Sequence, residues 1–240
     1  MISQSGVYGV AAAVSAAAFL VFLGWLSRVP ASRRRYCYPV VAVVGFSAAM
    51  SALTSMGVAP VAGTRLSVPS MIDDLVAYSV LWTVAVALAD ESRRMLAVAA
   101  VVPAVQVVAF NVASVVGGVV GLACLAVVVL GHGLMAYLLF GPIWRRAADV
   151  PDGQRLLHWK SRNLLLFLVG MLIVYALLSV AAVFDSFVIA VLRVYIGLLI
   201  RVGFAGFLFV NVTAIAVGGV GSTDSGPASF ADEAGVSGSD

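Results

Sequence analysis

The chain has 240 residues, of which 62% are apolar and only 10% are charged, with a formal net charge of +3. Soluble globular domains carry about 25% charged residues, so this composition excludes a soluble globular protein. We therefore predict a multi-pass protein of the cell membrane, with the lipid bilayer as its first partner.

A helix that spans a membrane needs about 20 apolar residues, and the chain contains seven segments of that length. In chain order, we expect these helices at residues 7–26, 36–58, 70–89, 95–116, 119–141, 162–183 and 187–217. Residues 142–161 are polar and are expected to form the loop before the sixth helix. The predicted fold is an all-α bundle of seven transmembrane helices, which forms one domain over residues 1–217.

Basic residues are divided unequally between the two ends of the predicted bundle. The loops after the first, third and fifth helices contain Arg28, Arg33, Arg34, Arg35, Arg93, Arg94, Arg145, Arg146, Arg155, Lys160 and Arg162. The opposite loops contain only Arg65. Because loops rich in Lys and Arg stay in the cytoplasm, we predict an outside N-terminus and a cytoplasmic C-terminus. Residues 218–240, rich in Gly, Ser and acidic residues, are expected to be a disordered cytoplasmic tail.

The order of residues in the second half of the chain is more specific than the number of helices. Tyr137-Leu-Leu-Phe-Gly141 is followed by a basic stretch and Arg162-Asn163, and the seventh helix contains Arg201-Val-Gly-Phe204. These motifs resemble those of the microbial (type 1) rhodopsins, and the haloarchaeal branch is the most similar. The resemblance covers residues 7–210 and implies a bacteriorhodopsin-like seven-helix fold.

The chain departs from the family at the chromophore. In microbial rhodopsins a lysine of the seventh helix binds retinal as a Schiff base, and the resemblance places Arg201 at that position. A guanidinium does not form this imine, and the single lysine, Lys160, lies in the predicted loop before the sixth helix. Asp73 falls on the counterion position. We therefore expect no covalently bound retinal, no other cofactor and no metal.

The resemblance implies that the rest of the retinal pocket is also changed. Asp74 replaces the tryptophan that follows the counterion, Val84 replaces the proton donor, and Gly197 replaces the second counterion of the seventh helix. The aromatic positions of the sixth helix become Val169, Leu172 and Ala176.

Arg201 lies about fifteen residues inside the predicted seventh helix, where an unpaired charge costs at least about 2.5–3.5 kcal/mol. The resemblance makes Asp73 its partner, so we expect a buried Arg201–Asp73 ion pair in place of the Schiff base and its counterion. At 1.5 Å per residue, Asp73 lies about 5 Å inside its helix and Arg201 about 21 Å inside its own. The pair therefore requires a seventh helix that protrudes outward, or a third helix that starts before Ser70.

Asp74 and Arg193 are secondary polar candidates. Adjacent residues point about 100° apart on a helix, so we expect only one of Asp73 and Asp74 to face the bundle. Arg193 lies two turns before Arg201 on another face of the seventh helix. Its alternatives are a pair with Asp74, a pair with Asp185, or a position at the outer interface.

Several functions are compatible with these residues. No nucleotide-binding or hydrolase motif occurs, so we expect neither an enzyme nor a nucleic-acid-binding protein. The leading prediction is an opsin-related protein that is not a light-driven pump and that regulates or contacts a membrane partner. By family association, this partner is an enzyme of carotenoid or retinal synthesis.

Three alternatives remain open: a light-independent ion channel or transporter centred on Arg201 and Asp73, a noncovalent retinoid- or carotenoid-binding protein, and a photoreceptor with another attachment site. Small residues in and after the fourth helix are expected to serve internal packing or a homo-oligomer contact; they are Ala97, Ala99, Ala100, Ala113, Gly117, Gly118 and Gly121.

Overall fold

The computed structural model describes residues 4–62, 66–180 and 183–216. Within these residues, seven helices are long and apolar enough to cross a membrane. The first five are α1 (Gln4–Leu26), α2 (Ala31–Ser55), α3 (Val68–Ala87), α4 (Arg93–Val116) and α5 (Gly118–Phe140). The sixth is α7 (Asp152–Val180), and the seventh consists of α8 (Ser186–Leu198), a π-helical turn η2 (Leu199–Gly203) and α9 (Phe204–Val210). The prediction of an all-α bundle with seven transmembrane helices is confirmed, and the protein is a multi-pass membrane protein.

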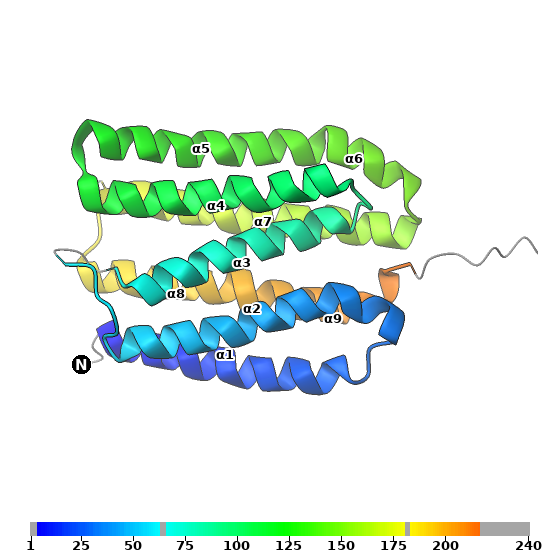
Figure 1. Ribbon diagram of the computed structural model, residues 1–240, viewed down its shortest axis with the longest axis horizontal. Coiled ribbons are helices and arrows are strands. Elements are labelled where there is room, and N and C mark those ends of the chain that lie inside the picture. The colour runs from blue at the N-terminus through cyan, green and yellow to red at the C-terminus, as the bar shows by residue number, and fades with distance from the viewer. Residues whose placement is uncertain (1–3, 63–65, 181–182, 217–240) are drawn as a thin grey trace, which may run out of the picture.

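Consecutive helices run in opposite directions and pack side by side (Figure 1). The bundle closes because α8 packs against α1, while α7 contacts both α3 and α5. Helices α1, α3 and α5 therefore end at the same side of the bundle at which α2, α4 and α7 begin. We call this side the basic end, because it carries Arg28, Arg33, Arg34, Arg35, Arg93 and Arg94.

The polar stretch 142–161, predicted as a loop, is mostly helical. It forms α6 (Pro142–Arg146), a short 3-10 turn η1 (Ala147–Asp149) and the first turns of α7. Asp152 favours a helix start because a carboxylate interacts well with the N-terminal helix dipole. Inside the bundle, Gln154 Nε2 donates to the Leu88 carbonyl at 2.8 Å. Lys160 is therefore not in a loop but at an exposed position of α7.

The seventh span is shorter than predicted and is not a continuous α-helix. The expected range was 187–217, whereas α9 ends at Val210 and is followed by a 3-10 turn, η3 (Val212–Ala214). Asp185 caps the start of α8, because its Oδ1 accepts from the backbone N–H groups of Phe187 and Val188. Among the described residues, no ion pair joins Arg193 to Asp185, one of its expected alternative partners.

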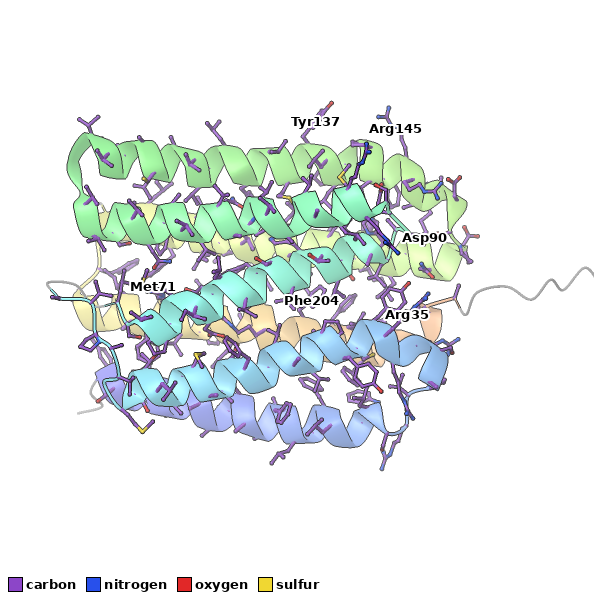
Figure 2. The ribbon with its side chains drawn as sticks, in the orientation of Figure 1. Arg35, Met71, Asp90, Tyr137, Arg145 and Phe204 are labelled. Atoms are coloured by element: carbon purple, nitrogen blue, oxygen red, sulfur yellow. The ribbon has the colours of Figure 1, made fainter. Side chains whose placement is uncertain are left out.

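The hydrophobic core is concentrated in the half of the bundle near the basic end. Its largest fully buried side chains include Leu81, Trp82, Leu139, Leu165, Phe204 and Leu208. Each of these residues lies in the half of its helix that is nearer to the basic end. Figure 2 shows Phe204 inside the bundle and Tyr137 on its outer surface, where 70% of Tyr137 is exposed. Outward apolar side chains of this kind are expected to face lipid.

Two parts of the sequence interpretation lie outside the described residues. Arg65, the single basic residue predicted for the outer loops, belongs to residues 63–65, and the predicted tail belongs to residues 217–240. The outside position of the N-terminus and the cytoplasmic position of the C-terminus remain predictions from the charge distribution.

Small residues allow close approach of neighbouring helices. Gly121 of α5 lies against the backbone of Ala113 in α4, so at least this part of the small-residue pattern serves packing within the chain. At Gly45 of α2, a Cβ atom would lie only 2.7 Å from Cε2 of Phe19 in α1. A side chain at this position would therefore displace the Phe19 ring from the α1–α2 contact.

We predict that Gly45→Val lowers the free energy of unfolding by about 1–3 kcal/mol, because the added side chain overpacks the α1–α2 contact. Thermal unfolding of the detergent-solubilised protein measures this loss. Gly24→Val in α1 is the matched control, since no neighbouring atom lies within 4 Å of its Cβ position. Equal losses in the two variants would contradict the packing argument.

Candidate functional site

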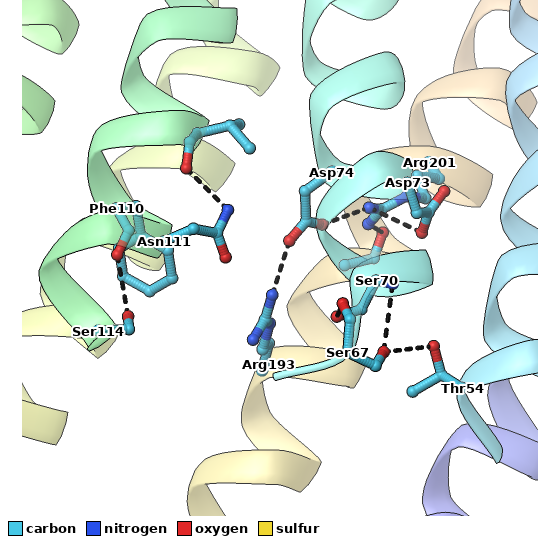
Figure 3. A network of polar contacts seen from close by, with 12 residues as sticks. Thr54, Ser67, Ser70, Asp73, Asp74, Phe110, Asn111, Ser114, Arg193 and Arg201 are labelled. Atoms are coloured by element: carbon cyan, nitrogen blue, oxygen red, sulfur yellow. Dashed lines mark hydrogen bonds and ion pairs between the residues drawn. The ribbon is translucent and has the colours of Figure 1, made fainter. Parts of the chain in front are cut away.

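Two aspartates of α3 and two arginines of the seventh span form an ion-pair network inside the bundle (Figure 3). Arg201 Nη2 lies 3.0 Å from Asp73 Oδ2 and 2.5 Å from Asp74 Oδ1. Arg193 Nη2 lies 2.8 Å from Asp74 Oδ2. Asp74 therefore bridges the two arginines. With two carboxylates and two guanidiniums, the formal charges of the network cancel.

The network also reaches α2. Ser47 Oγ donates to Asp73 Oδ1 at 2.5 Å, and Ser47 is buried. Three of the four carboxylate oxygens of Asp73 and Asp74 thus accept a hydrogen bond, and the fourth, Asp73 Oδ2, lies in the ion pair with Arg201. Charged groups buried in this way are tolerated only when their hydrogen bonds are satisfied. These five residues tie α2, α3 and the seventh span together.

Arg201 is held by the local shape of the seventh span. It lies in the π-helical turn η2, is 5% exposed, and donates from Nη1 to the Gly197 carbonyl at 3.1 Å. A Cβ atom at Gly197 would lie 2.8 Å from Nη1, so any side chain here would displace the guanidinium from this position. The Tyr78 ring of α3 lies 5.7 Å from the guanidinium carbon. π-Helical turns are frequent at functional sites, and here one contains Arg201, which carries the buried charge.

The structure brings together all four residues singled out in the sequence. The expectation that only one of Asp73 and Asp74 faces the bundle is wrong, because both contact the same nitrogen of Arg201. The two side chains leave α3 in directions about 100° apart, but both reach Arg201 because its guanidinium lies between the two carboxylates. Arg193 takes Asp74 as its partner, one of the alternatives left open.

The difference in depth between Asp73 and Arg201 is resolved by three features. Helix α3 begins at Val68, before the predicted Ser70. Figure 1 shows that the start of α8 extends beyond the start of α3. In addition, helical side chains point towards the N-terminus of their own helix. The long side chain of Arg201 therefore reaches outward to the level of Asp73.

Two small cavities adjoin the network. One, of about 50 Å³, is lined by hydroxyl residues such as Ser15, Ser51 and Thr54, together with Asp73 and Arg201. The other, of about 60 Å³, is mostly apolar and lies between α3, α4, α5, α7 and α8; Asp74, Arg193 and Gly197 border both. The network thus separates a polar cavity from an apolar one.

Several residues that the resemblance assigned to the retinal pocket line the apolar cavity. Val169, Leu172 and Ala176 of α7 and Gly197 of α8 line it, together with the buried Trp82. Pockets that enclose small organic ligands usually have volumes of about 300–1,000 Å³. A cavity of about 60 Å³ is too small for a twenty-carbon polyene such as retinal. The residues present do not fit this chromophore in the described conformation.

Sequence reasoning missed two members of the site, Ser47 and Tyr78. Tyr78 was detectable, because it lies four residues after Asp74 and therefore on the same face of α3. Ser47 was not, because α2 also contains Ser51, Thr54 and Ser55 and the sequence does not rank them.

Comparison with solved structures identifies the fold. The chain is similar to a cyanorhodopsin from the cyanobacterium Tolypothrix sp. NIES-4075, with a TM-score of 0.82 and 15% identity over 89% of this chain and 98% of that one. It is similar to the light-driven proton pump rhodopsin of Coccomyxa subellipsoidea, with a TM-score of 0.78 and 13% identity over 88% and 98% of the two chains. It is also similar to Exiguobacterium sibiricum rhodopsin, with a TM-score of 0.75 and 18% identity over 87% of this chain and 95% of that one. The chain therefore has the microbial rhodopsin fold.

No protein-family model and no curated protein matches the chain. At these identities, the structural likeness establishes the fold alone.

We predict that Asp74→Asn destabilises the protein by about 3–5 kcal/mol, because it leaves two buried guanidiniums with a single carboxylate. Combining Asp74→Asn with Arg193→Gln restores charge balance and is expected to recover more than half of the loss. Unfolding in mixed detergent micelles measures both values.

The control for this pair is Asp149→Asn, which removes an exposed ion pair with Arg146 and should change stability by less than about 0.5 kcal/mol. If the double variant were as unstable as Asp74→Asn alone, charge balance would not be what holds the network together.

Proposed function

We propose that this protein is an opsin-like membrane protein that forms no covalent retinal pigment and acts independently of light, through contacts with another membrane protein. The observation that carries the proposal is the pairing of Arg201 with Asp73 and Asp74. In this interpretation, Arg201 occupies the place of the Schiff-base lysine, and the ion pairs replace the Schiff base and its counterion.

The single lysine supports this interpretation. Lys160 lies at an exposed position near the basic end of α7, whereas the apolar cavity lies beside Asp74 and Arg193 of the network. A lysine on the outer surface of α7 does not provide an amine to that cavity. The small volume of the cavity also argues against noncovalent binding of a retinoid or carotenoid in the interior.

The packing of the basic half argues against the alternative of a light-independent channel or transporter. Leu81 and Trp82 follow Asp73 along α3, and Phe204 and Leu208 follow Arg201 along the seventh span. All four are fully buried and belong to the same hydrophobic cluster. An ion that left the network towards the basic end would meet this apolar layer. Arginines also stay protonated, so they do not relay protons.

Some neighbours of similar fold are described as light-driven proton pumps. Transfer of that activity to this chain requires a chromophore, and the site favours none. The interior holds a charge-neutral ion-pair network and a buried apolar layer. Contacts with a partner would therefore be made by the outer surface, which supports a regulatory or interaction role. The haloarchaeal affinity, and an enzyme of carotenoid or retinal synthesis as the partner, rest on the sequence resemblance.

We predict that purified protein mixed with all-trans retinal shows no new visible absorption band, because neither the cavity nor Lys160 provides a site. Arg201→Lys supplies an amine next to Asp73 but does not enlarge the cavity, so it is also expected to gain no band; a band that hydroxylamine bleaches in this variant alone would show that the amine, and not the cavity volume, is what the wild-type protein lacks. Absorption spectra of the two proteins, recorded side by side, make this test.

Lys160→Arg is the matched control, because it removes every lysine from the chain. A wild-type band that disappears in Lys160→Arg would establish a covalent pigment through Lys160. A wild-type band that persists in Lys160→Arg would establish noncovalent binding. Either result would overturn the proposal.

We also predict that photo-crosslinking in native membranes attaches the protein to another membrane protein, equally in light and in darkness. Crosslinkers are placed on exposed positions such as Tyr137 and Leu130 of α5. Identification by mass spectrometry should return the same partner from both positions or from adjacent ones. Recovery of lipid and self-contacts alone would contradict the interaction role.

A further inference from the structure

A surface groove lies between α2, α3 and α4 near the basic end, away from the ion-pair network. Its volume is about 520 Å³, which is within the range of sites that hold small organic molecules. The apolar part of its lining consists of Val80 and Val84 of α3, Pro39 of α2, and Leu96 and Ala100 of α4. Because these helices span the membrane, this part of the groove is accessible to the hydrocarbon chains of lipids.

Three charged side chains line the same groove. Arg35 of α2 is positive, whereas Asp90 and Glu91, between α3 and α4, are negative. Figure 2 shows Arg35 and Asp90 at the same end of the bundle. Among the described residues, no ion pair within 4.0 Å joins Arg35 to either carboxylate. One positive and two negative charges thus give the lining an excess of negative charge, and no direct pairing cancels them.

Local contacts hold these side chains but leave most of their donors and acceptors unused. Arg35 Nη2 donates to the Tyr36 hydroxyl at 3.2 Å, and its guanidinium carbon lies 4.9 Å from the centre of the Tyr36 ring. Glu91 Oε2 accepts from the Ser92 backbone N–H at 3.1 Å. The other guanidinium donors suit a phosphate, and the other carboxylate oxygens suit a cation that donates hydrogen bonds. The groove therefore offers a place for a phosphate and a place for an ammonium.

We propose that this groove binds a zwitterionic phospholipid whose headgroup carries a primary ammonium, namely phosphatidylethanolamine. Its phosphate accepts from Arg35, its ammonium donates to Asp90 or Glu91, and one acyl chain lies along Val80 and Val84. Each charge of the headgroup then meets an opposite charge of the lining. Phosphatidylglycerol brings only negative charge to a lining that already has an excess of it, and the choline of phosphatidylcholine has no N–H to donate. The three charges of the lining are sufficient for this selection, without the other arginines of the basic end.

The test uses the full-length protein in bilayers with equal amounts of phosphatidylethanolamine, its N-monomethyl and N,N-dimethyl derivatives, phosphatidylcholine and phosphatidylglycerol, all with the same acyl chains. After solubilisation, lipids that remain bound are quantified by mass spectrometry. Each methylation keeps the positive charge of the headgroup but removes one N–H donor. We expect phosphatidylethanolamine to be retained at least about fivefold over phosphatidylcholine, which corresponds to about 1 kcal/mol, with the derivatives in between. Phosphatidylglycerol should be retained no better than phosphatidylcholine.

The charges of the lining are expected to have separable effects. Asp90→Asn with Glu91→Gln removes the charges that select the ammonium, so retention should become equal within about twofold across the methylated series. Arg35→Gln removes the contact with the phosphate, which all these lipids share. It should therefore lower the retention of phosphatidylethanolamine and phosphatidylcholine by the same factor and leave their ratio unchanged.

Matched controls separate the groove from general surface effects. Asp152→Asn removes an exposed carboxylate of the same end and Arg94→Gln an exposed arginine, and neither residue lines the groove. Both variants should retain the five lipids in the wild-type proportions within about twofold, because exposed charges interact weakly. Ala100→Phe fills the groove, whereas Ala97→Phe adds the same ring to an exposed position of α4 outside it. Only Ala100→Phe should reduce the retention of phosphatidylethanolamine.

Four results would overturn the proposal. Equal retention of phosphatidylethanolamine and phosphatidylcholine by the wild-type protein would show that the carboxylates select no ammonium. Retention of phosphatidylglycerol above phosphatidylethanolamine would show that the site prefers negative charge. A preference lost as fully in Asp152→Asn as in the Asp90 and Glu91 double variant would show that the groove carboxylates have no special role. Equal effects of Ala97→Phe and Ala100→Phe would show that the lipid lies elsewhere.

Discussion

The cost of a permanent charge inside an apolar bundle determines the organisation of this protein. Arg201 does not escape this cost by losing its proton, because a guanidinium stays protonated at any accessible pH. Its charge must therefore be matched by a carboxylate. Two carboxylates, Asp73 and Asp74, contact it, and the second would leave an excess of negative charge. Arg193 balances that excess, so the fourth charge of the network follows from the first three.

A network of this kind differs in chemistry from a lysine Schiff base. An imine gains and loses a proton, whereas the two arginines keep their charges and hold the carboxylates in fixed places. Gly197 and the π-helical turn η2 shape the backbone around this fixed charge. The network stabilises one arrangement of α2, α3 and the seventh span, and it offers no group that switches between two charge states without breaking an ion pair. This is consistent with an interior that holds the helices together rather than one that moves ions.

Hydropathy was sufficient to predict the seven spans, because in lipid every backbone group must be paired within a helix. It failed at residues 142–161, because two polar side chains there bond to backbone carbonyls inside the bundle: Gln154 to that of Leu88 and His158 to that of Ala85. The angular argument about Asp73 and Asp74 failed for a different reason. It fixed the direction of each Cβ atom but ignored the reach of Arg201, whose guanidinium lies between the two carboxylates.

The ion-pair network and the apolar layer of the basic half lie at different depths, and the same helices build both. Helix α2 contributes Ser47 to the network and Val40 to the layer, and α3 contributes Asp73 and Leu81. Leu81, Trp82 and Phe204 form the tightly packed part of this layer, which lies nearer the basic end than the network. Close-packed cores transmit strain because they have little free volume. The packing of α2, α3 and the seventh span in this layer therefore depends on the charge balance of the network, because the same helices carry both.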